Sequence, residues 1–260
     1  MNPNSLAGMK VLLTRPLVQQ GSLRETIEAH AGEVVSMPLM KIYRLEHVDD
    51  IQSVKDKIQN LDNYHSLIFI STNAASYGAE WINRYWPQFP AAVNVIAIGP
   101  TTAQSVIDQI GCEVTLADTG MCSEDLLRLA VLQDVKGKSI AIIRGKGGRE
   151  LLAESLRERG ARIDYLEVYQ RQSIHYDAQQ FHRILLAEAV NVLTVSSGES
   201  LNSLLAALGD NKEEMSLLPL LVPSERIAQQ ARDVGFNRVV SAGGADAESF
   251  LLALESLEMG

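Results

Sequence analysis

The chain of 260 residues contains an internal repeat whose period is close to half its length. A segment that starts at Lys10 can be laid over one that starts at Lys138, 128 positions later. Both contain a short apolar run, an arginine, a glycine-bearing loop, an amphipathic stretch, a glycine and a second β-rich run, and they end in KIYR and VYQR. The segments from Val95 and Leu220 give a similar period of 125 positions. Because a fixed period indicates a structural unit that occurs more than once, the sequence predicts a duplicated fold.

Short, continuous apolar runs alternate with stretches of helical pattern along the chain. They read VLLT, LIFIS, VIAIG, IAIIR, VLTV, LLVP and RVVS. Runs of this kind are typical of parallel strands that are covered on both faces, and their alternation with helical segments of about ten to fifteen residues indicates βαβ crossovers. The sequence therefore predicts an α/β fold. The expected boundaries are a helix start at Ser123 and helix ends at Gly32, Gly111, Gly160 and Gly235.

The order of the repeated segments leaves two domain arrangements open. We name the shorter segments A (from Lys10) and A′ (from Lys138), and the longer segments B (from Ser66) and B′ (from Asn191). Each domain could combine A with B in chain order, or the halves could be exchanged so that A packs with B′ and B with A′. Periodicity does not distinguish the two. The KIYR and VYQR tails suggest two extended strands that leave their units, as the exchanged arrangement requires.

Composition limits the classes of partner and the compartment. The formal net charge is −9, which argues against a dedicated nucleic-acid binder or a binder of anionic membranes. The two cysteines, Cys112 and Cys122, lack the spacing of a zinc or redox site and are expected to be reduced. The first ten residues have no apolar core of the secretory type, and no apolar run approaches the roughly 20 residues of a membrane helix. We therefore expect a cytoplasmic protein.

The common motifs of metal and cofactor chemistry are missing from the sequence. The five histidines show no H-E-x-x-H or clustered ligand spacing, and no G-x-S-x-G nucleophile elbow is present. The glycine-rich stretch from Arg144 to Arg149 matches neither a Walker A motif nor a dinucleotide-binding motif. We therefore expect no metal, and neither a phosphate loop nor a dinucleotide-binding site.

Small hydroxyl, amide and glycine residues follow several of the predicted strands at the start of a helix. They are Ser71, Thr72, Asn73, Gly99, Thr101, Ser196, Ser197, Gly198 and Ser224. Each could be an N-cap that satisfies the first amides of a helix. Together they could form a binding site, because ligands of open α/β sheets bind at the carboxyl ends of the strands, where helix N-termini present amides and a positive dipole end.

Four cations lie near the same strand ends: Arg15, Arg144, Lys146 and Arg149. If two such sheets faced each other, these cations and the helix amides would suit a polyanion between them. Arg15 and Arg144 are the stronger candidates, because they occupy equivalent positions after the first strands of A and A′. The alternative is that each cation is a solvated loop charge.

Two tyrosines occupy matching positions in the expected connecting strands. They are Tyr43 and Tyr169. A tyrosine in a connection is usually a packing residue with a wet hydroxyl. Tyr169 could instead direct a neutral phenol at a ligand, where it would donate a hydrogen bond or protonate a leaving group.

Five segments, in this order and over nearly the whole chain, carry a resemblance to a known family. They are VLLTRP from Val11, IFISTNA from Ile68, AIGPTTA from Ala97, IIRGKGGRE from Ile142 with the LLAESLRERGARIDYLEVYQR that follows, and TVSSGESL from Thr194. In order and spacing the chain resembles the uroporphyrinogen-III synthase family.

The resemblance implies a bilobed α/β protein of two flavodoxin-like, parallel-sheet domains joined by a two-stranded linker. It favours the exchanged arrangement, with a discontinuous first domain of residues 1–40 and 172–260, a second domain of residues 46–165, and linker strands at 41–45 and 166–171. It also implies an enzyme without a cofactor. The family's reaction closes hydroxymethylbilane, a linear tetrapyrrole with eight carboxylates, to uroporphyrinogen III with loss of water and inversion of ring D.

The resemblance also suggests residue roles. Tyr169 matches the family's tyrosine in the second linker and is expected to assist departure of the hydroxyl. The hydroxyl, amide and glycine residues listed above, together with Arg15, Arg144 and Lys146, are expected to bind the substrate. The second copy of the glycine–threonine turn reads VPSERIA, so it departs from the pattern of the first copy and Ser224 stands in for a threonine there. We expect a monomer. The alternative function is a non-catalytic, bilobed cytoplasmic binder of a small anionic ligand.

Overall fold

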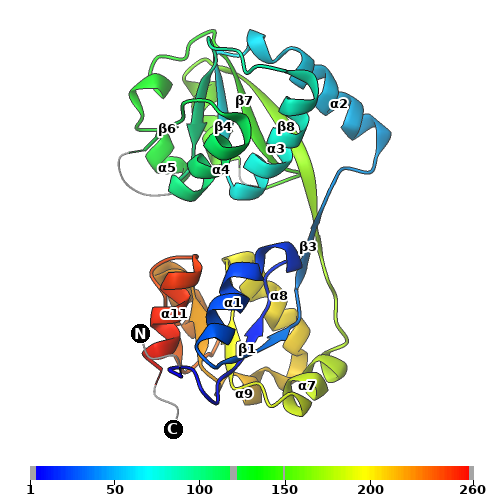
Figure 1. Ribbon diagram of the computed structural model, residues 1–260, viewed down its shortest axis with the longest axis vertical. Coiled ribbons are helices and arrows are strands. Elements are labelled where there is room, and N and C mark those ends of the chain that lie inside the picture. The colour runs from blue at the N-terminus through cyan, green and yellow to red at the C-terminus, as the bar shows by residue number, and fades with distance from the viewer. Residues whose placement is uncertain (1–3, 118–121, 149, 258–260) are drawn as a thin grey trace. The chain divides into compact units, whose positions relative to one another are not determined.

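The computed structural model describes residues 4–117, 122–148 and 150–257, which form two compact units (Figure 1). Unit 1 comprises Met1–Ile42 and Gln172–Gly260, and unit 2 comprises Tyr43–Arg171. The chain enters unit 2 at the end of strand β3 (Met40–Tyr43) and leaves it within strand β8 (Arg162–Ser173). These two strands are hydrogen-bonded neighbours.

Unit 1 contains a five-stranded sheet in the order β11-β10-β9-β1-β2, and all its neighbouring strands are parallel. Its strands are β1 (Lys10–Leu13), β2 (Glu33–Ser36), β9 (Val192–Thr194), β10 (Leu220–Val222) and β11 (Val239–Ser241). Its helices are α1 (Gly21–Ala29), α7 (Ala178–Ala187), α8 (Gly198–Leu208), α9 (Lys212–Met215), α10 (Glu225–Asp233) and α11 (Ala247–Glu255), with 3₁₀ turns η1 (Leu17–Gln19) and η4 (Gly209–Asn211).

Both faces of this sheet are buried. Leu12 of β1 packs into a core with α7, α8 and α10, whereas its neighbours Val11 and Leu13 pack into a second core with α1 and α11. Side chains alternate between the faces of a strand, so a strand that lies between two helix layers needs apolar residues at every position. The predicted α/β fold with parallel strands is confirmed.

Unit 2 repeats this plan with parallel strands in the order β8-β7-β4-β5-β6, and β3 lies beside β8. Its remaining strands are β4 (Ser66–Phe69), β5 (Asn94–Ala97), β6 (Thr115–Leu116) and β7 (Ser139–Gly145). Its helices are α2 (Val48–Gln59), α3 (Thr72–Tyr85), α4 (Pro100–Ile110), α5 (Ser123–Leu126) and α6 (Leu151–Glu158), with 3₁₀ turns η2 (Leu61–Asn63) and η3 (Ala130–Leu132).

The strands pair in the exchanged manner. β1 of segment A pairs with β9 of segment B′, and β4 of segment B pairs with β7 of segment A′. Two buried threonines reinforce the first pairing: Thr14 Oγ1 donates to the Thr194 carbonyl at 2.7 Å, and Thr194 Oγ1 donates to the Leu12 carbonyl at 2.7 Å. Each sheet therefore contains a strand pair formed across more than 70 residues of chain.

Most of the predicted helix boundaries agree with the structure, but two differ in detail. Gly111, Gly160 and Gly235 follow helix ends with positive φ angles, as expected. After α1 it is Ala31 that takes the left-handed conformation, at φ 64°. Gly32 is needed for space instead, because a Cβ there would lie 2.7 Å from Ile27 Cγ2. Ser123 is the first residue of α5 and not its cap, since Cys122 occupies the N-cap position.

Candidate functional site

Most of the residues predicted from the strand ends lie where the strand order reverses in each sheet. In unit 1 this point lies between β1 and β9, which are followed by Arg15 and by Ser196–Gly198. In unit 2 it lies between β7 and β4, which lead into Lys146 and into Ser71–Asn73. Such a topological switch point, at the carboxyl ends of the strands, is the usual ligand-binding position of doubly wound sheets.

Tyr169 lies at the switch point of unit 2. Its side chain is 5% exposed, and its phenol oxygen lies 3.3 Å from Ser71 Oγ. The ring stacks on Tyr77 of α3, with centroids 5.4 Å apart and an angle of 27° between the planes. Burial raises the pKa of Tyr77, so its phenol stays neutral over the ordinary pH range. Two predicted residues, Tyr169 and Ser71, are thus brought together across 98 positions of sequence.

Ser71 is also the N-cap of α3. Its Oγ accepts a hydrogen bond from the Ala74 amide at 3.0 Å, as expected of a cap. The capping role and the contact with Tyr169 are compatible, because a hydroxyl accepts through its lone pairs and still has one proton to donate. Thr72 and Asn73, in the first turn of α3, are partly exposed.

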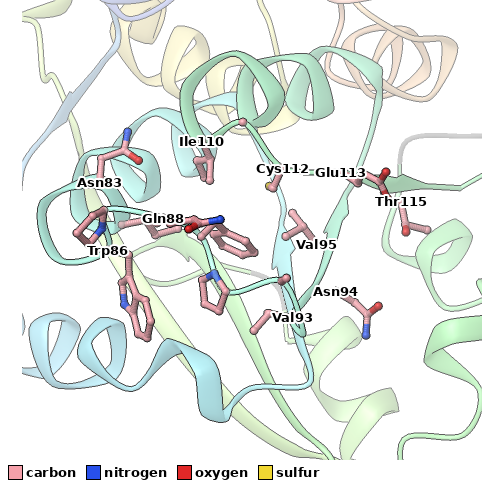
Figure 2. Close-up of a pocket in the computed structure, with 16 residues that line it drawn as sticks. Asn83, Trp86, Gln88, Val93, Asn94, Val95, Ile110, Cys112, Glu113 and Thr115 are labelled. Atoms are coloured by element: carbon pink, nitrogen blue, oxygen red, sulfur yellow. The ribbon is translucent and has the colours of Figure 1, made fainter.

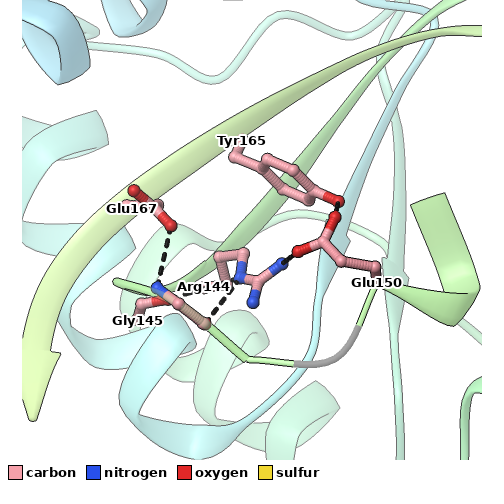
Figure 3. A network of polar contacts seen from close by, with 6 residues as sticks. Arg144, Gly145, Glu150, Tyr165 and Glu167 are labelled. Atoms are coloured by element: carbon pink, nitrogen blue, oxygen red, sulfur yellow. Dashed lines mark hydrogen bonds and ion pairs between the residues drawn. The ribbon is translucent and has the colours of Figure 1, made fainter. Parts of the chain in front are cut away.

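Arg144 is buried, although the sequence suggested a ligand-binding cation. Its side chain is 2% exposed (Figure 3). Nε donates to the carbonyls of Gly145 at 3.3 Å and Gly147 at 3.0 Å, and Nη1 pairs with Glu150 Oε1 at 3.2 Å. The guanidinium lies 4.6 Å from the ring centroid of Tyr165, whose hydroxyl donates to Glu150. The tyrosine bond, together with Arg144, lowers the pKa of Glu150.

The loop that follows β7 therefore presents carbonyls, and not amides, to its interior. The Lys146 amide donates to the Tyr169 carbonyl at 2.8 Å, and the Gly147 amide donates to Glu167 Oε1 at 3.0 Å. Phosphate loops use such amides to bind the anion. The Lys146 ammonium pairs with Asp50 at 2.7 Å, and this contact raises its pKa. Arg149 lies outside the described residues.

Arg15 occupies a comparable position in unit 1. Its Nη2 donates to the Ala245 carbonyl at 2.7 Å, and the guanidinium lies 4.7 Å from the ring centroid of Phe250. Burial lowers the pKa of Arg15, and the nearby Asp246 carboxylate opposes this shift. The loop that follows Arg15 is held by Gln20, whose Nε2 donates to the Arg15 carbonyl at 2.7 Å.

The other predicted residues of unit 1 lie at the starts of helices α8 and α10. Ser197 caps α8 and accepts from the Ser200 amide at 3.1 Å, while the amides of Ser196 and Ser197 donate to Ser200 Oγ. Ser224 occupies the N-cap position of α10 without a side-chain cap bond. A Cβ on Gly198 would lie 3.1 Å from Gln230 Oε1.

One strand further out in unit 2, Gly99 occupies the N-cap position of α4. Thr101, in the first turn of that helix, is exposed, whereas Thr102 is buried. The hydroxyl of Thr101 is therefore available at the carboxyl edge of the sheet.

Three residues of the site were missed in the sequence. Glu150 and Tyr165 lie inside the segments quoted for the resemblance, but nothing in their spacing showed that both contact Arg144. Tyr77 belongs to an ordinary amphipathic helix, and no local pattern distinguishes it from a packing residue. Such contacts depend on how β8 and α3 are placed, which local patterns do not specify.

A cavity of about 560 Å³ lies at the opposite edge of unit 2 (Figure 2). It is lined by the end of α3, the end of α4 and the amino end of β5, including Trp86, Asn94 and Cys112. The charged residue in its lining is Glu113. Because of this carboxylate and its position, the cavity does not suit the anionic ligand expected at the carboxyl edge.

Among residues 4–117, 122–148 and 150–257, no group of three or more histidine, cysteine, aspartate or glutamate side chains is placed to hold a metal ion. Within the same ranges, no helix combines the length and the apolar character that crossing a membrane requires.

Comparisons with known proteins agree on one family. The family model of uroporphyrinogen-III synthase HemD matches residues 21–251. Uroporphyrinogen-III synthases of Salmonella typhimurium and Escherichia coli are each 32% identical to the chain, over 249 and 252 residues, covering 95% of this chain and 100% of each relative.

Solved structures with a similar fold carry the same name. A variant of uroporphyrinogen III synthase from Thermus thermophilus aligns with a TM-score of 0.64 and 17% identity, covering 96% of this chain and 100% of its own. Uroporphyrinogen-III synthetase from Helicobacter pylori aligns with a TM-score of 0.56 and 14% identity, covering 96% and 99%. At these identities the likeness concerns the fold.

Proposed function

Since the chain belongs to the uroporphyrinogen-III synthase family, we propose that it converts hydroxymethylbilane to uroporphyrinogen III. The terminal hydroxyl of the linear tetrapyrrole leaves as water and gives an azafulvenium cation. The substituted carbon of ring D attacks this cation to form a spiro intermediate, which fragments and closes again at the other carbon of the ring. Loss of a ring proton restores the pyrrole, and the net change is the loss of one water.

The chief task of the protein in this reaction is to hold a reactive chain in one geometry. Hydroxymethylbilane ionises readily, and simple closure of the cation gives the symmetric type I isomer. Positioning of the reacting groups is therefore the source of selectivity. Few indispensable side chains are needed for this task.

The single observation that supports the residue-level proposal is the contact between Tyr169 and Ser71 at a topological switch point. We assign to the Tyr169 phenol the donation of a hydrogen bond to the departing hydroxyl. This role requires only a hydrogen bond from the phenol and not full transfer of its proton. The amide end of α3 beside it stabilises negative charge that builds on the phenol oxygen.

The substrate carboxylates would be bound by helix amides, small hydroxyl groups and a few cations at the carboxyl edge of each sheet. The proposed set is Arg15, Ser71, Thr72, Asn73, Gly99, Thr101, Lys146, Ser196, Ser197, Gly198 and Ser224. Helix N-termini bind carboxylates through their amides and dipole, so a protein with a net charge of −9 needs no basic surface for this purpose.

The finer features of the family expectation belong to the same proposal. Residues 1–40 with 172–260 and residues 46–165 would be the two domains, with 41–45 and 166–171 as their links. The protein would work as a cytoplasmic monomer without a cofactor, a nucleic acid or a membrane. Analytical ultracentrifugation tests whether the protein is a monomer. Activity after exhaustive chelation and dialysis tests whether it works without a cofactor.

The proposal is tested by the isomer of the product. The protein is incubated with freshly prepared hydroxymethylbilane, the product is oxidised, and the uroporphyrin isomers are separated. Type III product is expected. Product of type I only, together with thermal stabilisation by a different small anion, would indicate the alternative function of a non-catalytic binder.

A further inference from the structure

We propose that Arg144, Glu150 and Tyr165 form a clamp that positions the Tyr169 phenol. In this role Arg144 acts through the loop that follows β7 and does not bind the substrate itself. The proposal rests on the function proposed above, because it concerns the tyrosine assigned to the departing hydroxyl. The three residues of the clamp come from the end of β7, the N-cap position of α6 and the middle of β8.

Arg144 fixes the shape of its own loop. Its guanidinium bonds the carbonyls of Gly145 and Gly147 and is held from outside by Glu150. The fit is tight, since a Cβ added to Gly148 would lie 2.6 Å from Arg144 Nη2. A bonded guanidinium that is 2% exposed would have to leave all these partners before it could meet a substrate carboxylate.

This loop touches Tyr169. A Cβ added to Gly145 would lie 2.5 Å from Cε2 and 2.6 Å from Cζ of the Tyr169 ring, so the ring lies directly on the glycine backbone. The Lys146 amide donates to the Tyr169 carbonyl at 2.8 Å. A shift of the loop would therefore move the backbone and the ring of Tyr169 together.

The register between β7 and β8 shifts at the same place. Arg144 is paired with Glu167, whereas the next residue, Gly145, is paired with Tyr169. The extra residue on β8 is Val168, and Val168 and Tyr169 are both buried although they are consecutive. Side chains normally alternate between faces along a strand, and a bulge re-aims the side chain that follows it. The bond from the Gly147 amide to Glu167 ties the loop to this bulge.

The central test is a double-mutant cycle with Arg144→Met and Tyr169→Phe. We expect Arg144→Met alone to lower kcat by about tenfold with little change in KM, because the phenol is misplaced while the substrate-binding groups remain. With phenylalanine at position 169, the same change should lower kcat by less than about threefold, because residues that act through one another are not additive. The fraction of type III product is recorded for each variant.

Arg157→Met is the matched control. The Arg157 guanidinium lies 5.5 Å from the centroid of the same Tyr165 ring, and the residue is exposed on α6. Its removal should leave kcat and KM as they are. If Arg144→Met does not fold, the cycle is run with Glu150→Gln, which removes one charge from a side chain that is 47% exposed. Thermal denaturation of every variant shows which of these cases holds.

A readout independent of turnover separates this inference from the proposed function. The protein is labelled with 3-fluorotyrosine, and the ¹⁹F resonance of Tyr169 is identified as the one that Tyr169→Phe removes. Arg144→Met or Glu150→Gln should shift that resonance, and Arg157→Met should not. If the resonance moves but the wild-type protein makes no type III product, the clamp stands and the proposed function fails.

Three results would overturn the clamp. One is a Tyr169 resonance that does not respond to either change in the clamp. Another is an additive cycle, in which Arg144→Met lowers kcat by the same factor with tyrosine and with phenylalanine at position 169. The third is a rise in KM at constant kcat, which would make Arg144 a direct substrate ligand.

Discussion

The Tyr169 phenol oxygen lies 3.3 Å from Ser71 Oγ, and Ser71 caps the helix that begins at that point. This contact links β8, which carries the chain back to unit 1, with the carboxyl end of β4. It places a phenol that can donate a hydrogen bond beside the amide end of α3. Reaction chemistry and anion binding are thus assigned to one edge of the sheet in unit 2.

Tyr169→Phe tests the role of the phenol most simply. The change retains the ring that lies on Gly145 and stacks on Tyr77 but removes the hydroxyl. We expect kcat to fall by about tenfold or more, because the departing hydroxyl loses a hydrogen-bond donor, with a similar KM and melting temperature. Steady-state kinetics check this. An unchanged rate would make Tyr169 a packing residue.

Ser71→Ala should affect both stability and rate. Loss of an N-cap costs about 1 kcal/mol, and the variant also loses the contact with Tyr169. Ser197→Ala removes the equivalent cap in unit 1, where Ser197 Oγ accepts the same kind of bond from the Ser200 amide. Urea denaturation should show similar losses of stability for the two variants. The contact with Tyr169 is lost only in Ser71→Ala, so the effect on rate through Tyr169 is expected of that variant alone. If the two variants differ in stability by several kcal/mol, capping is not their common effect.

Gly145→Ala should displace Tyr169. Because the added Cβ would lie 2.5 Å from the ring, the ring has to move. We expect kcat to fall about as far as in Tyr169→Phe. Gly21→Ala is the steric control, since a Cβ there meets nothing within 4 Å, and its melting temperature should match that of the wild type. A Gly145→Ala variant with full activity would show that the place of the ring does not matter.

Thr194→Val should weaken the pairing of β1 with β9. The substitution keeps the shape of the side chain and removes the buried bond to the Leu12 carbonyl. A lost hydrogen bond of this kind costs about 1 to 3 kcal/mol when it leaves a buried partner unsatisfied. Thr26→Val, which removes a comparable bond to Ser22 on the partly exposed helix α1, should cost much less. Equal effects in urea denaturation would contradict the importance of the buried pair.

The contribution of Glu150 to stability should depend on pH. The pKa of this carboxyl is lowered from its ordinary value of 4.5, chiefly by the hydrogen bond from Tyr165 and also by Arg144. A group whose pKa is lowered by folding stabilises the fold at pH values above its pKa in the unfolded chain. This contribution is lost as the pH falls through its pKa in the folded protein. The wild type should therefore melt higher than Glu150→Gln at neutral pH, with a gap that closes below about pH 4.5. A gap that widens on acidification would have the wrong sign.

The sequence was sufficient for the α/β class, for the parallel strands and for the duplication, because each depends on local apolar runs and on periodicity. It left the exchange of halves open until the resemblance was considered, since the pairing of β1 with β9 is a long-range choice between similar strands. The burial of Arg144 could not be predicted, because an arginine before glycines is equally consistent with an exposed loop charge. The bulge that aims Tyr169 leaves no pattern in the residues around Val168.

The isomer of the product tests the central claim most directly. Fresh hydroxymethylbilane is mixed with a range of protein concentrations. The uroporphyrin isomers formed after oxidation are separated, quantified and compared with those of a reaction without protein. The account predicts that the type III fraction rises with protein until it dominates, and that Tyr169→Phe needs much more protein to reach the same fraction. Type I product alone at the highest wild-type concentration would contradict it.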